Sequence, residues 1–555
     1  MSGAVIEYDV EVPMRDGVVL RADVYRPMGD GPFPVIVTRT PYNRTSSIEI
    51  SHLDPWAAVR LGFIAVVQDT RGRFASDGDG PWKPFVGEDL DGADTIEWAA
   101  RLPGSSGRVG MWGMSYLGNV QWQAASRRPP SLGAIVPTMT WRDPDDGLAT
   151  RGGAKELGVS RFWGLLTGFD VVVRAHSGDE LRLSERLASM VKDFDDLAGR
   201  TYWELPTESD PVLERHGAPS FSPVETRSAA NVVPLVDAVH VPSLNIGGWF
   251  DIFLQGTIDN FVEVRKHTVS KLVIGPWCHV NHAPFQGELD FGVASDGSAQ
   301  GSPAWIPGMA FDWLRKHVST DAPAIPDRAV RIFVMGANEW RDEDEWPLAR
   351  AVDTPHFLAA DGSLSARPAS EYTSSNYTYD PRDPVPTRGG GTLLAGFPAG
   401  AFDQAPVESR DDVLVFTSEV LDDDVEVTGR VTATLFVESD APTTDWVVRL
   451  CDVHPDGRSY NVTDGIARVR MEPEVAQVVT VDLWSTSMLF KQGHRIRVQV
   501  TSSCFPRWDR NLNALDGQES GAMHVAKQTI YLGGSTGSFI TLPLISEGVA
   551  SGLRR

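Results

Sequence analysis

The chain has 555 residues, of which 42% are hydrophobic and 22% charged. These fractions are typical of globular proteins and exclude wholesale disorder or a collagen-like repeat. At about 100–200 residues per domain, the length predicts two to four domains. The 50 Lys and Arg residues against 74 Asp and Glu residues give a formal charge of −24. So acidic a surface repels phosphate backbones and anionic membranes, so we expect neither nucleic acid nor a membrane as a partner.

Cysteine use and the first residues indicate the compartment. Cys278, Cys451 and Cys504 lie far apart and lack metal-ligand spacing, which argues against a disulfide framework and against a zinc site. The opening MSGAVIEYDVEV has neither the basic nor the apolar segment of a signal peptide. No apolar run approaches the ~20 residues that span a bilayer. We therefore expect a cytoplasmic protein.

Residues 1–140 alternate short apolar runs with amphipathic stretches. The runs predict strands and the stretches predict helices, the clearest being strands at 5–12, 18–25, 35–37, 63–67, 109–112 and 134–136 and helices at 88–101 and 116–126. The short continuous apolar runs are typical of strands buried on both faces. Such alternation predicts a mainly parallel sheet covered by helices.

The alternation breaks at residues 141–239, which are helical and poor in strands, with the clearest helix at 181–197. It resumes over 240–350, where strands at 241–246 and 272–274 flank a helix. We therefore expect one discontinuous α/β domain, built from 1–140 and 240–350, with 141–239 inserted as a helical cap.

Residues 351–555 lose the helical periodicity and show many short alternating runs, as at 431–437 and 495–500, separated by turn signals. This pattern predicts a β sandwich or jelly roll. The Pro-rich stretch 381–386 and the glycines 389–391 look like linker. Asp452 to Gly457 superficially resembles a calcium loop, but Thr463 stands where the loop requires Glu, so we predict a hairpin turn.

The strongest chemical signal is Gly-Met-Ser-Tyr-Leu-Gly at 113–118, between a predicted strand and a predicted helix. A serine on such a sharp turn stands above the sheet, and the helix N-terminus beside it stabilises negative charge. The usual pattern is G-x-S-x-G, whereas the second glycine here comes one residue later. Ser115 is thus the candidate nucleophile; the alternative is an ordinary glycine-rich turn with a buried serine.

A serine nucleophile needs a base, and the base needs an orienting acid. Asp251 follows the strand at 241–246 and His279 follows the strand at 272–274, in the Ser, Asp, His order of α/β-hydrolases. Both would lie at the carboxyl edge of the sheet, where such sites form. Asp251 could instead cap the next helix, and His279 could be a core histidine bonded to a carbonyl. His282 is the alternative base.

Several segments together resemble one family. They are VPMRDGVVLRADVYRP, RTPYNR, VVQDTRGRFASDGDG, GMWGMSYLGNVQWQAA, GGWFD, VIGPWCHVN, RIFVMGANEWRDEDEWPL and RVQVTSSCFPRWDRN, and they span nearly the whole chain. The chain resembles the cocaine esterase group of serine hydrolases, with the related Xaa-Pro dipeptidyl-peptidases and α-amino acid ester hydrolases. The resemblance implies an α/β-hydrolase domain, an inserted helical domain, a C-terminal jelly roll and a triad of Ser115, Asp251 and His279. The shifted glycine is the family's own variant.

The resemblance also implies an oxyanion hole made by the Tyr42 hydroxyl and the backbone N–H of Tyr116. Each preorganised donor of this kind contributes roughly 3–4 kcal/mol to transition-state stabilisation. Without the resemblance, Tyr42 would be an unremarked loop aromatic.

Trp141, Trp163 and Phe253 are candidates for the wall of a substrate pocket, because aromatic side chains in a cap commonly build an apolar slot. Domain-interface packing is the alternative for each. Phe253 also matches a pocket residue of the family by position. The resemblance further places the loop near Leu393 and Leu394 across the cleft.

These features predict a serine carboxylesterase that works through an acyl-enzyme on small-molecule esters, with no metal or cofactor. Ile252, Phe253 and Leu254 could not pair a cation, which favours an uncharged aromatic or hydrophobic acyl group. The alternatives are an α-amino acid ester hydrolase or acylase, a Xaa-Pro dipeptidyl-peptidase and, from another class, a carbohydrate-binding protein with an inert hydrolase domain. The sequence leaves open the natural substrate, the preference between esters and amides, and whether the chain forms a homodimer.

Overall fold

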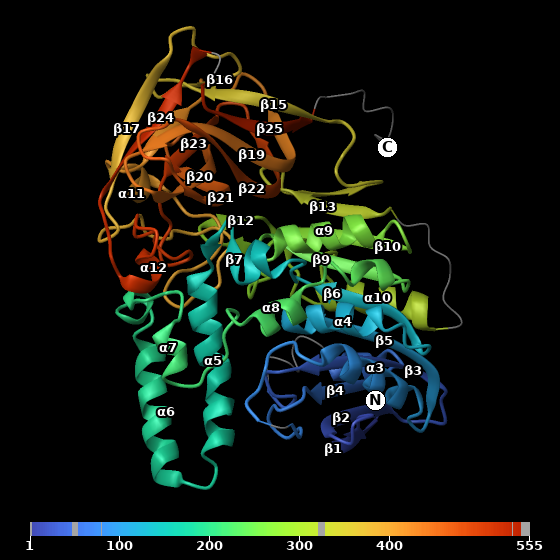
Figure 1. The fold of residues 1–555 in the computed structure, drawn as a ribbon. Coiled ribbons are helices and arrows are strands. Elements are labelled where there is room, and N and C mark those ends of the chain that lie inside the picture. The colour runs from blue at the N-terminus through green and yellow to red at the C-terminus, as the bar shows by residue number, and fades with distance from the viewer. Residues whose placement is uncertain (1–2, 47–53, 79, 320–327, 535–536, 546–555) are drawn as a thin grey trace, which may run out of the picture.

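The computed structural model describes residues 3–46, 54–78, 80–319, 328–534 and 537–545 (Figure 1). Within these residues the largest sheet has ten strands. In spatial order they are β1 (Ala4–Pro13), β2 (Val19–Pro27), β4 (Ile64–Asp69), β3 (Phe33–Thr40), β5 (Ser105–Met114), β6 (Leu132–Thr138), β9 (Ser243–Phe250), β10 (Ser270–Cys278), β13 (Val330–Val334) and β14 (Glu339–Glu343). The strands from β4 to β13 run parallel, while β1, β2 and β14 are antiparallel to their neighbours.

Helices cover both faces of this sheet, as the continuous apolar runs predict. They are α2 (Pro55–Arg60), α3 (Glu88–Ala100), α4 (Tyr116–Ser126), α9 (Leu254–Val264) and α10 (Ile306–Val318). On β3, Ile36 packs into the cluster with α2 and α10, while Val35 and Val37 pack into the cluster with α3 and α4. Successive side chains of a strand point to opposite faces, so one apolar run supplies both cores. The predicted α/β-hydrolase class is confirmed.

Between β6 and β9 the described chain is mostly helical, with α5 (Leu157–Ala175), α6 (Glu180–Asp195), α7 (Pro211–Glu214) and α8 (Val224–Ala230). In Figure 1, α5 and α6 form a long hairpin that projects from the rest of the molecule. The predicted helix at 181–197 corresponds to α6. On this helix Leu181 and Val191 are exposed, whereas Met190 is buried. No helix among the described residues, α5 included, is long and apolar enough to cross a membrane.

The C-terminal region is an all-β domain of two sheets, as predicted. The seven-stranded sheet contains, in order, β16 (Leu364–Ser365), β15 (Ala351–Leu358), β25 (Phe539–Ile545), β19 (Val425–Ser439), β24 (Ala526–Leu532) and β17 (Thr373–Tyr379), with β22 (Gln477–Phe490) paired to β19. The four-stranded sheet contains β18 (Leu414–Thr417), β23 (Arg495–Thr501), β20 (Thr443–Val453) and β21 (Ser459–Arg470). One buried apolar cluster joins strands of both sheets to β9 and β13 of the hydrolase sheet, so the two domains share a packed interface.

The stretch expected to be a linker is instead packed into the structure. Val385 is fully buried, and Gly390 pairs with Gly400 in an isolated β-bridge. A Cβ at position 391 would lie 3.0 Å from the backbone oxygen of Asp251. The linker interpretation is therefore wrong: these glycines allow the backbone of the β domain to approach the loop after β9 closely.

Candidate active site

Ser115 occupies the turn between β5 and α4. Its backbone has φ 62° and ψ −120°, a conformation that side-chain-bearing residues rarely adopt and that is typical of strained functional positions. Its N–H donates to the Thr138 carbonyl at 2.9 Å, and its own carbonyl accepts from the N–H groups of Gly118 and Asn119. These bonds hold the turn and place the serine at the N-terminus of α4.

Close packing explains both glycines of the turn. A Cβ at position 113 would lie 2.4 Å from the Cβ of Leu117, and one at position 118 would lie 2.8 Å from the Cβ of Thr140. Glycine is therefore required where α4 crosses β5 and where it meets the end of β6. Leu117 packs into the aromatic cluster around the turn, so the second glycine is needed at 118 and not at 117.

Asp251 and His279 follow directly after β9 and β10, two neighbouring parallel strands. Phe250 lies opposite Cys278 in the register, so the two strands end at the same level of the sheet. The His279 Nδ1 and Asp251 Oδ1 atoms are 2.6 Å apart, and both residues are buried. A buried carboxylate in contact with an imidazole Nδ1 is the arrangement that an acid–base pair beside a nucleophile requires.

The sequence left alternative roles open for Asp251, His279 and His282, and the structure bears on each of them. Asp251 is not the cap of the next helix, because the N-cap residue of α9 is Phe253, which has no side-chain cap. The Asp251 Oδ2 instead accepts the Phe253 N–H at 2.9 Å in a tight turn, while Oδ1 contacts the imidazole. His279 lies against a carboxylate rather than a carbonyl. His282 lines a separate cavity with Trp112 and Gly113.

Ser115 lines a small cavity of about 10 Å³. The wall is aromatic and aliphatic, consisting of Tyr42, Phe85, Tyr116, Trp141, Leu148, Val159, Trp163, Phe221, Phe253 and Leu393. The three aromatics expected in a substrate pocket are thus beside the serine, and so is Leu393, whereas Leu394 packs against the helical insertion. Sequence reasoning missed Phe85, Leu148, Val159 and Phe221, which come from separate loops and helices and carry no local motif.

Phe253 connects this cavity to the histidine. Its ring lines the cavity and stands edge-on to the His279 imidazole, with 5.2 Å between the ring centroids. The imidazole is therefore a neighbour of the serine cavity. Among the described residues no hydrogen bond joins the Ser115 hydroxyl to His279, and such bonds are often long before substrate binds.

Tyr42 approaches the cavity from the loop after β3. Its oxygen accepts a hydrogen bond from the Trp163 indole N–H at 2.8 Å. Accepting one hydrogen bond polarises a phenol and makes its own O–H a better donor. The Tyr42 and Tyr116 rings meet edge to face, 6.4 Å apart.

Arg44 anchors the loop that carries Tyr42. Its guanidinium contacts Asp69, Asp23 and Asp9 at 2.5, 2.9 and 2.8 Å, and its backbone N–H donates to Asp69 at 2.7 Å. Burial raises the pKa of Asp69, although the hydrogen bonds and charge of Arg44 oppose that rise. A buried cation held by three carboxylates fixes the loop to the end of the sheet.

The side-chain hydroxyl of Tyr116 is already engaged in two hydrogen bonds. Its hydroxyl donates to Glu88 at 2.8 Å and accepts from the Phe85 N–H at 3.0 Å, while the other Glu88 oxygen pairs with Arg39 at 2.6 Å. Burial raises the pKa of Tyr116 well above its ordinary value, so the phenol stays neutral. What Tyr116 can offer a bound anion is its backbone N–H, because the first residue of a helix has no intrahelical acceptor.

Known families match both parts of the chain. Residues 16–281 match the X-Pro dipeptidyl-peptidase (S15 family), and residues 326–541 match the X-Pro dipeptidyl-peptidase C-terminal non-catalytic domain. With the α/β-hydrolase fold, these matches define the class of the protein as a serine hydrolase. The second match corresponds to the all-β domain.

Individual relatives specify the family further. The chain is 36% identical to cocaine esterase of Rhodococcus sp. (strain MB1 Bresler), over 97% of this chain and 98% of the relative. It belongs to the family of serine hydrolases that includes cocaine esterase and the X-Pro dipeptidyl-peptidases.

Two solved structures share the whole fold. An aminopeptidase from a marine sediment archaeon, Thaumarchaeota archaeon, superposes with a TM-score of 0.79 at 25% identity, over 98% of this chain and 97% of its own. An α-amino acid ester hydrolase gives a TM-score of 0.79 at 24% identity with the same coverage. The second likeness concerns the fold alone.

Proposed function

We propose that the chain is a serine carboxylesterase in which Ser115 is the nucleophile, His279 the general base and Asp251 its orienting acid. The observation that carries the proposal is the 2.6 Å contact of His279 Nδ1 with Asp251, at strand ends beside the cavity of Ser115. With Nδ1 committed to the carboxylate, Nε2 is the nitrogen that accepts the serine proton.

The proposed reaction has two similar halves, acylation of Ser115 and hydrolysis of the acyl-enzyme. Nε2 of His279 takes the Ser115 proton as Oγ attacks the ester carbonyl carbon, and the oxyanion is held by the Tyr42 hydroxyl and the Tyr116 backbone N–H. The bond to the alcohol oxygen breaks, and the alcohol leaves with the proton from His279. Water attacks the acyl-enzyme in the same way and releases the acid and free Ser115.

The composition of the cavity wall supports an uncharged aromatic or hydrophobic acyl group. Among the described residues that line it there is no Asp, Glu, Lys or Arg. The nearby Glu88 is already engaged by Tyr116 and Arg39. A substrate ammonium would therefore be buried without a partner, which costs several kcal/mol. This disfavours α-amino acid esters and X-Pro peptides, which carry such a group.

The cavity at Ser115 is small, about 10 Å³, and aromatic rings of the helical insertion form part of its wall. Trp163 and Phe221 stack at 4.7 Å between ring centroids, and both border the cavity. Their elements, α5 and the segment before α8, belong to the helical insertion. We infer that the insertion acts as a cap whose outward movement admits the substrate.

The formal charge of −24 also supports a protein without a nucleic-acid partner. Gel filtration with light scattering distinguishes a monomer from a homodimer.

A substrate panel tests the proposal. The panel holds p-nitrophenyl acetate, p-nitrophenyl benzoate, phenylglycine methyl ester and a p-nitroanilide, with initial rates compared at equal enzyme concentration. We expect turnover of both p-nitrophenyl esters, with benzoate favoured in kcat/KM, and weak turnover of the charged ester and the anilide. Preference for the ammonium-bearing ester would favour an α-amino acid ester hydrolase, and absence of any p-nitrophenol release would favour a binding protein.

A further inference from the structure

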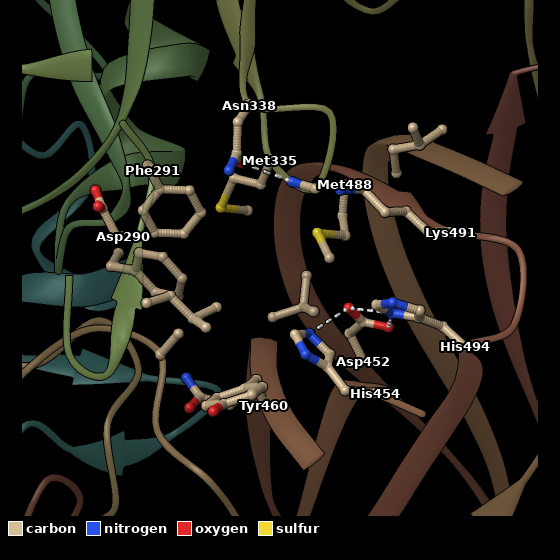
Figure 2. A pocket seen from close by; sticks show the side chains of 17 residues that line it. Asp290, Phe291, Met335, Asn338, Asp452, His454, Tyr460, Met488, Lys491 and His494 are labelled. Carbon is tan, nitrogen blue, oxygen red and sulfur yellow. Dashed lines mark hydrogen bonds and ion pairs between the residues drawn. The ribbon is translucent and has the colours of Figure 1, made fainter. Parts of the chain in front are cut away.

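Another cavity, of about 230 Å³, lies where the β domain meets the hydrolase domain (Figure 2). The hydrolase domain contributes Phe250, Asp290, Phe291, Met335 and Asn338, and the β domain contributes Asp452, His454, Tyr460, Met488, Lys491 and His494. Unlike the cavity at Ser115, this one has Asp, His and Lys side chains in its wall. Nothing in the proposed ester hydrolysis uses them.

Three of these side chains converge because of strand register. Asp452 lies near the end of β20, and it stands opposite Ile496 on β23. His494 directly precedes β23, and His454 opens the turn from β20 to β21. That turn is the hairpin expected from the sequence, closed by the His454 N–H donating to the Arg458 carbonyl at 2.9 Å. Residues 40 positions apart therefore meet at one end of the sheet.

The spacing of the three side chains suits a shared metal ion. The Nδ1 of His494 lies 2.9 Å from Asp452 Oδ1, and the Nε2 of His454 lies 3.3 Å from Asp452 Oδ2. One candidate ligand atom from each residue lies within 4.8 Å of both others. A tetrahedral zinc ion with bonds of about 2.0–2.1 Å separates neighbouring ligand atoms by about 3.3 Å. Small side-chain rotations would thus bring all three atoms to one centre.

Burial and charge favour the same interpretation. The Asp452 side chain is 2% exposed, that of His494 13% and that of His454 27%, so the carboxylate is buried and the imidazoles border the opening. Figure 2 shows Asp452 between the two rings, whose centroids are 4.5 Å apart. The wall also holds one further acid, Asp290, and one cation, Lys491. Within the described part of the chain, this is the one group of three His, Cys, Asp or Glu side chains so placed.

We propose that Asp452, His454 and His494 bind one divalent transition-metal ion, with Zn²⁺ as the ion that the site fits best. Two imidazole nitrogens and a carboxylate oxygen are borderline donors that zinc accepts in four-coordinate geometry. The fourth position opens to the cavity and would be filled by water or by a small anion. Such an ion ties the β20–β21 turn to the start of β23, so it would stabilise the β domain at its contact with the hydrolase domain.

Calorimetric titration tests the site. The chain, without a histidine tag, is stripped with EDTA, dialysed and titrated with ZnCl₂. We expect one Zn²⁺ per chain, with the affinity reduced at least about tenfold in each of His454→Gln and His494→Gln, because loss of groups that support a metal already costs 10–100-fold. We also expect Zn²⁺ to raise the melting temperature of the parent chain and not that of the variants. The substitution of the partly exposed His454 is the one least able to disturb folding.

A matched control comes from another imidazole pair. His240 and His267 lie 6.3 Å apart by ring centroid, and Asp237 is 3.3 Å from His267. His267→Gln should leave zinc binding unchanged. Circular dichroism and turnover of p-nitrophenyl acetate, which should be unaffected by EDTA, confirm that each variant is folded.

A second probe reports on the ligands directly. Co²⁺ added to the stripped chain should give the intense visible bands of four-coordinate cobalt, and these should be absent in His494→Gln. Failure of the parent chain to bind Zn²⁺ would overturn the proposal and leave a hydrogen-bonded His–Asp–His cluster. Equal binding by the parent and both His454→Gln and His494→Gln would also overturn it, because the ion would then sit elsewhere.

Discussion

The two cavities contain the same elementary unit in different surroundings. Asp251 with His279 and Asp452 with His494 are both buried aspartates in contact with an imidazole Nδ1, at 2.6 and 2.9 Å. Beside the first pair stands a serine on a strained turn, in an apolar cavity of about 10 Å³. Beside the second stands another imidazole, in a cavity of about 230 Å³ whose wall also holds Asp290 and Lys491. An Asp–His pair therefore does not specify a function by itself; the third group and the walls do.

The largest expected effect is a difference in kcat between variants of Asp251 and Asp452. Asp251→Asn should lower kcat for a p-nitrophenyl ester by about 10⁴-fold, because the amide no longer holds the imidazole in the tautomer that accepts a proton. Asp452→Asn should leave kcat within a few-fold of the parent, since its histidines take no part in the proposed reaction. Steady-state kinetics on the two purified variants make the comparison. Equal losses would show that the two pairs are not functionally distinct.

The next effect concerns the wall of the apolar cavity. Tyr42→Phe should lower kcat by about a hundredfold with KM nearly unchanged, because the lost hydroxyl stabilises charge that develops only in the transition state. Trp163→Phe keeps an aromatic ring and removes only the N–H that donates to Tyr42, so its effect on kcat should be smaller. The same p-nitrophenyl ester assay measures both. If kcat were the same in Tyr42→Phe and the parent, Tyr42 would have no place in the oxyanion hole.

A third buried carboxylate extends the comparison, because it has no imidazole beside it. Glu156 accepts a hydrogen bond from the Trp508 indole at 2.8 Å, and burial raises its pKa from 4.5 to about 7. The folded chain thus keeps the proton to higher pH than the unfolded chain, so the free energy of unfolding falls as pH rises from about 4.5 to 7. That fall amounts to at most about 3 kcal/mol, at 1.36 kcal/mol per pKa unit.

Glu156→Gln should remove this part of the pH dependence, because glutamine does not titrate. Urea unfolding at about pH 5 and about pH 8 measures the difference. Glu180→Gln is the control, since Glu180 is exposed on α6 and its change should leave the pH dependence as in the parent. A Glu156→Gln variant with the parent's full pH dependence would contradict the account.

Local pattern was enough to predict the elements that carry the first site. The turn at Ser115 is encoded within six residues, and Asp251 and His279 each follow an apolar run. The predicted strands ended too early, at 246 and 274, because glycines follow in both. In the structure β9 and β10 continue to Phe250 and Cys278. A Cβ at position 248 would lie 2.2 Å from the Trp277 carbonyl, so glycine is what lets the two strands pack side by side.

The remaining contacts join residues that are far apart in the chain, so they could not be predicted from the sequence. His454 and His494 meet only through the register of β20 with β23, which no short segment encodes. Phe85 and Phe221 reach the Ser115 cavity from loops far apart in the chain. Likewise, the glycines at 389–391 look like linker until Asp251 is seen against them. In each case the fold, and not a motif, brings the residues together.

Covalent labelling of the nucleophile tests the central claim most directly. The parent chain and Ser115→Ala are treated with a serine-directed organophosphate, digested and analysed by mass spectrometry, while loss of esterase activity is followed in parallel. We predict one adduct per parent chain, on Ser115, formed in step with the loss of activity, and no adduct at the site in Ser115→Ala. An inactivating adduct on a different residue, or full ester turnover by Ser115→Ala, would contradict the account.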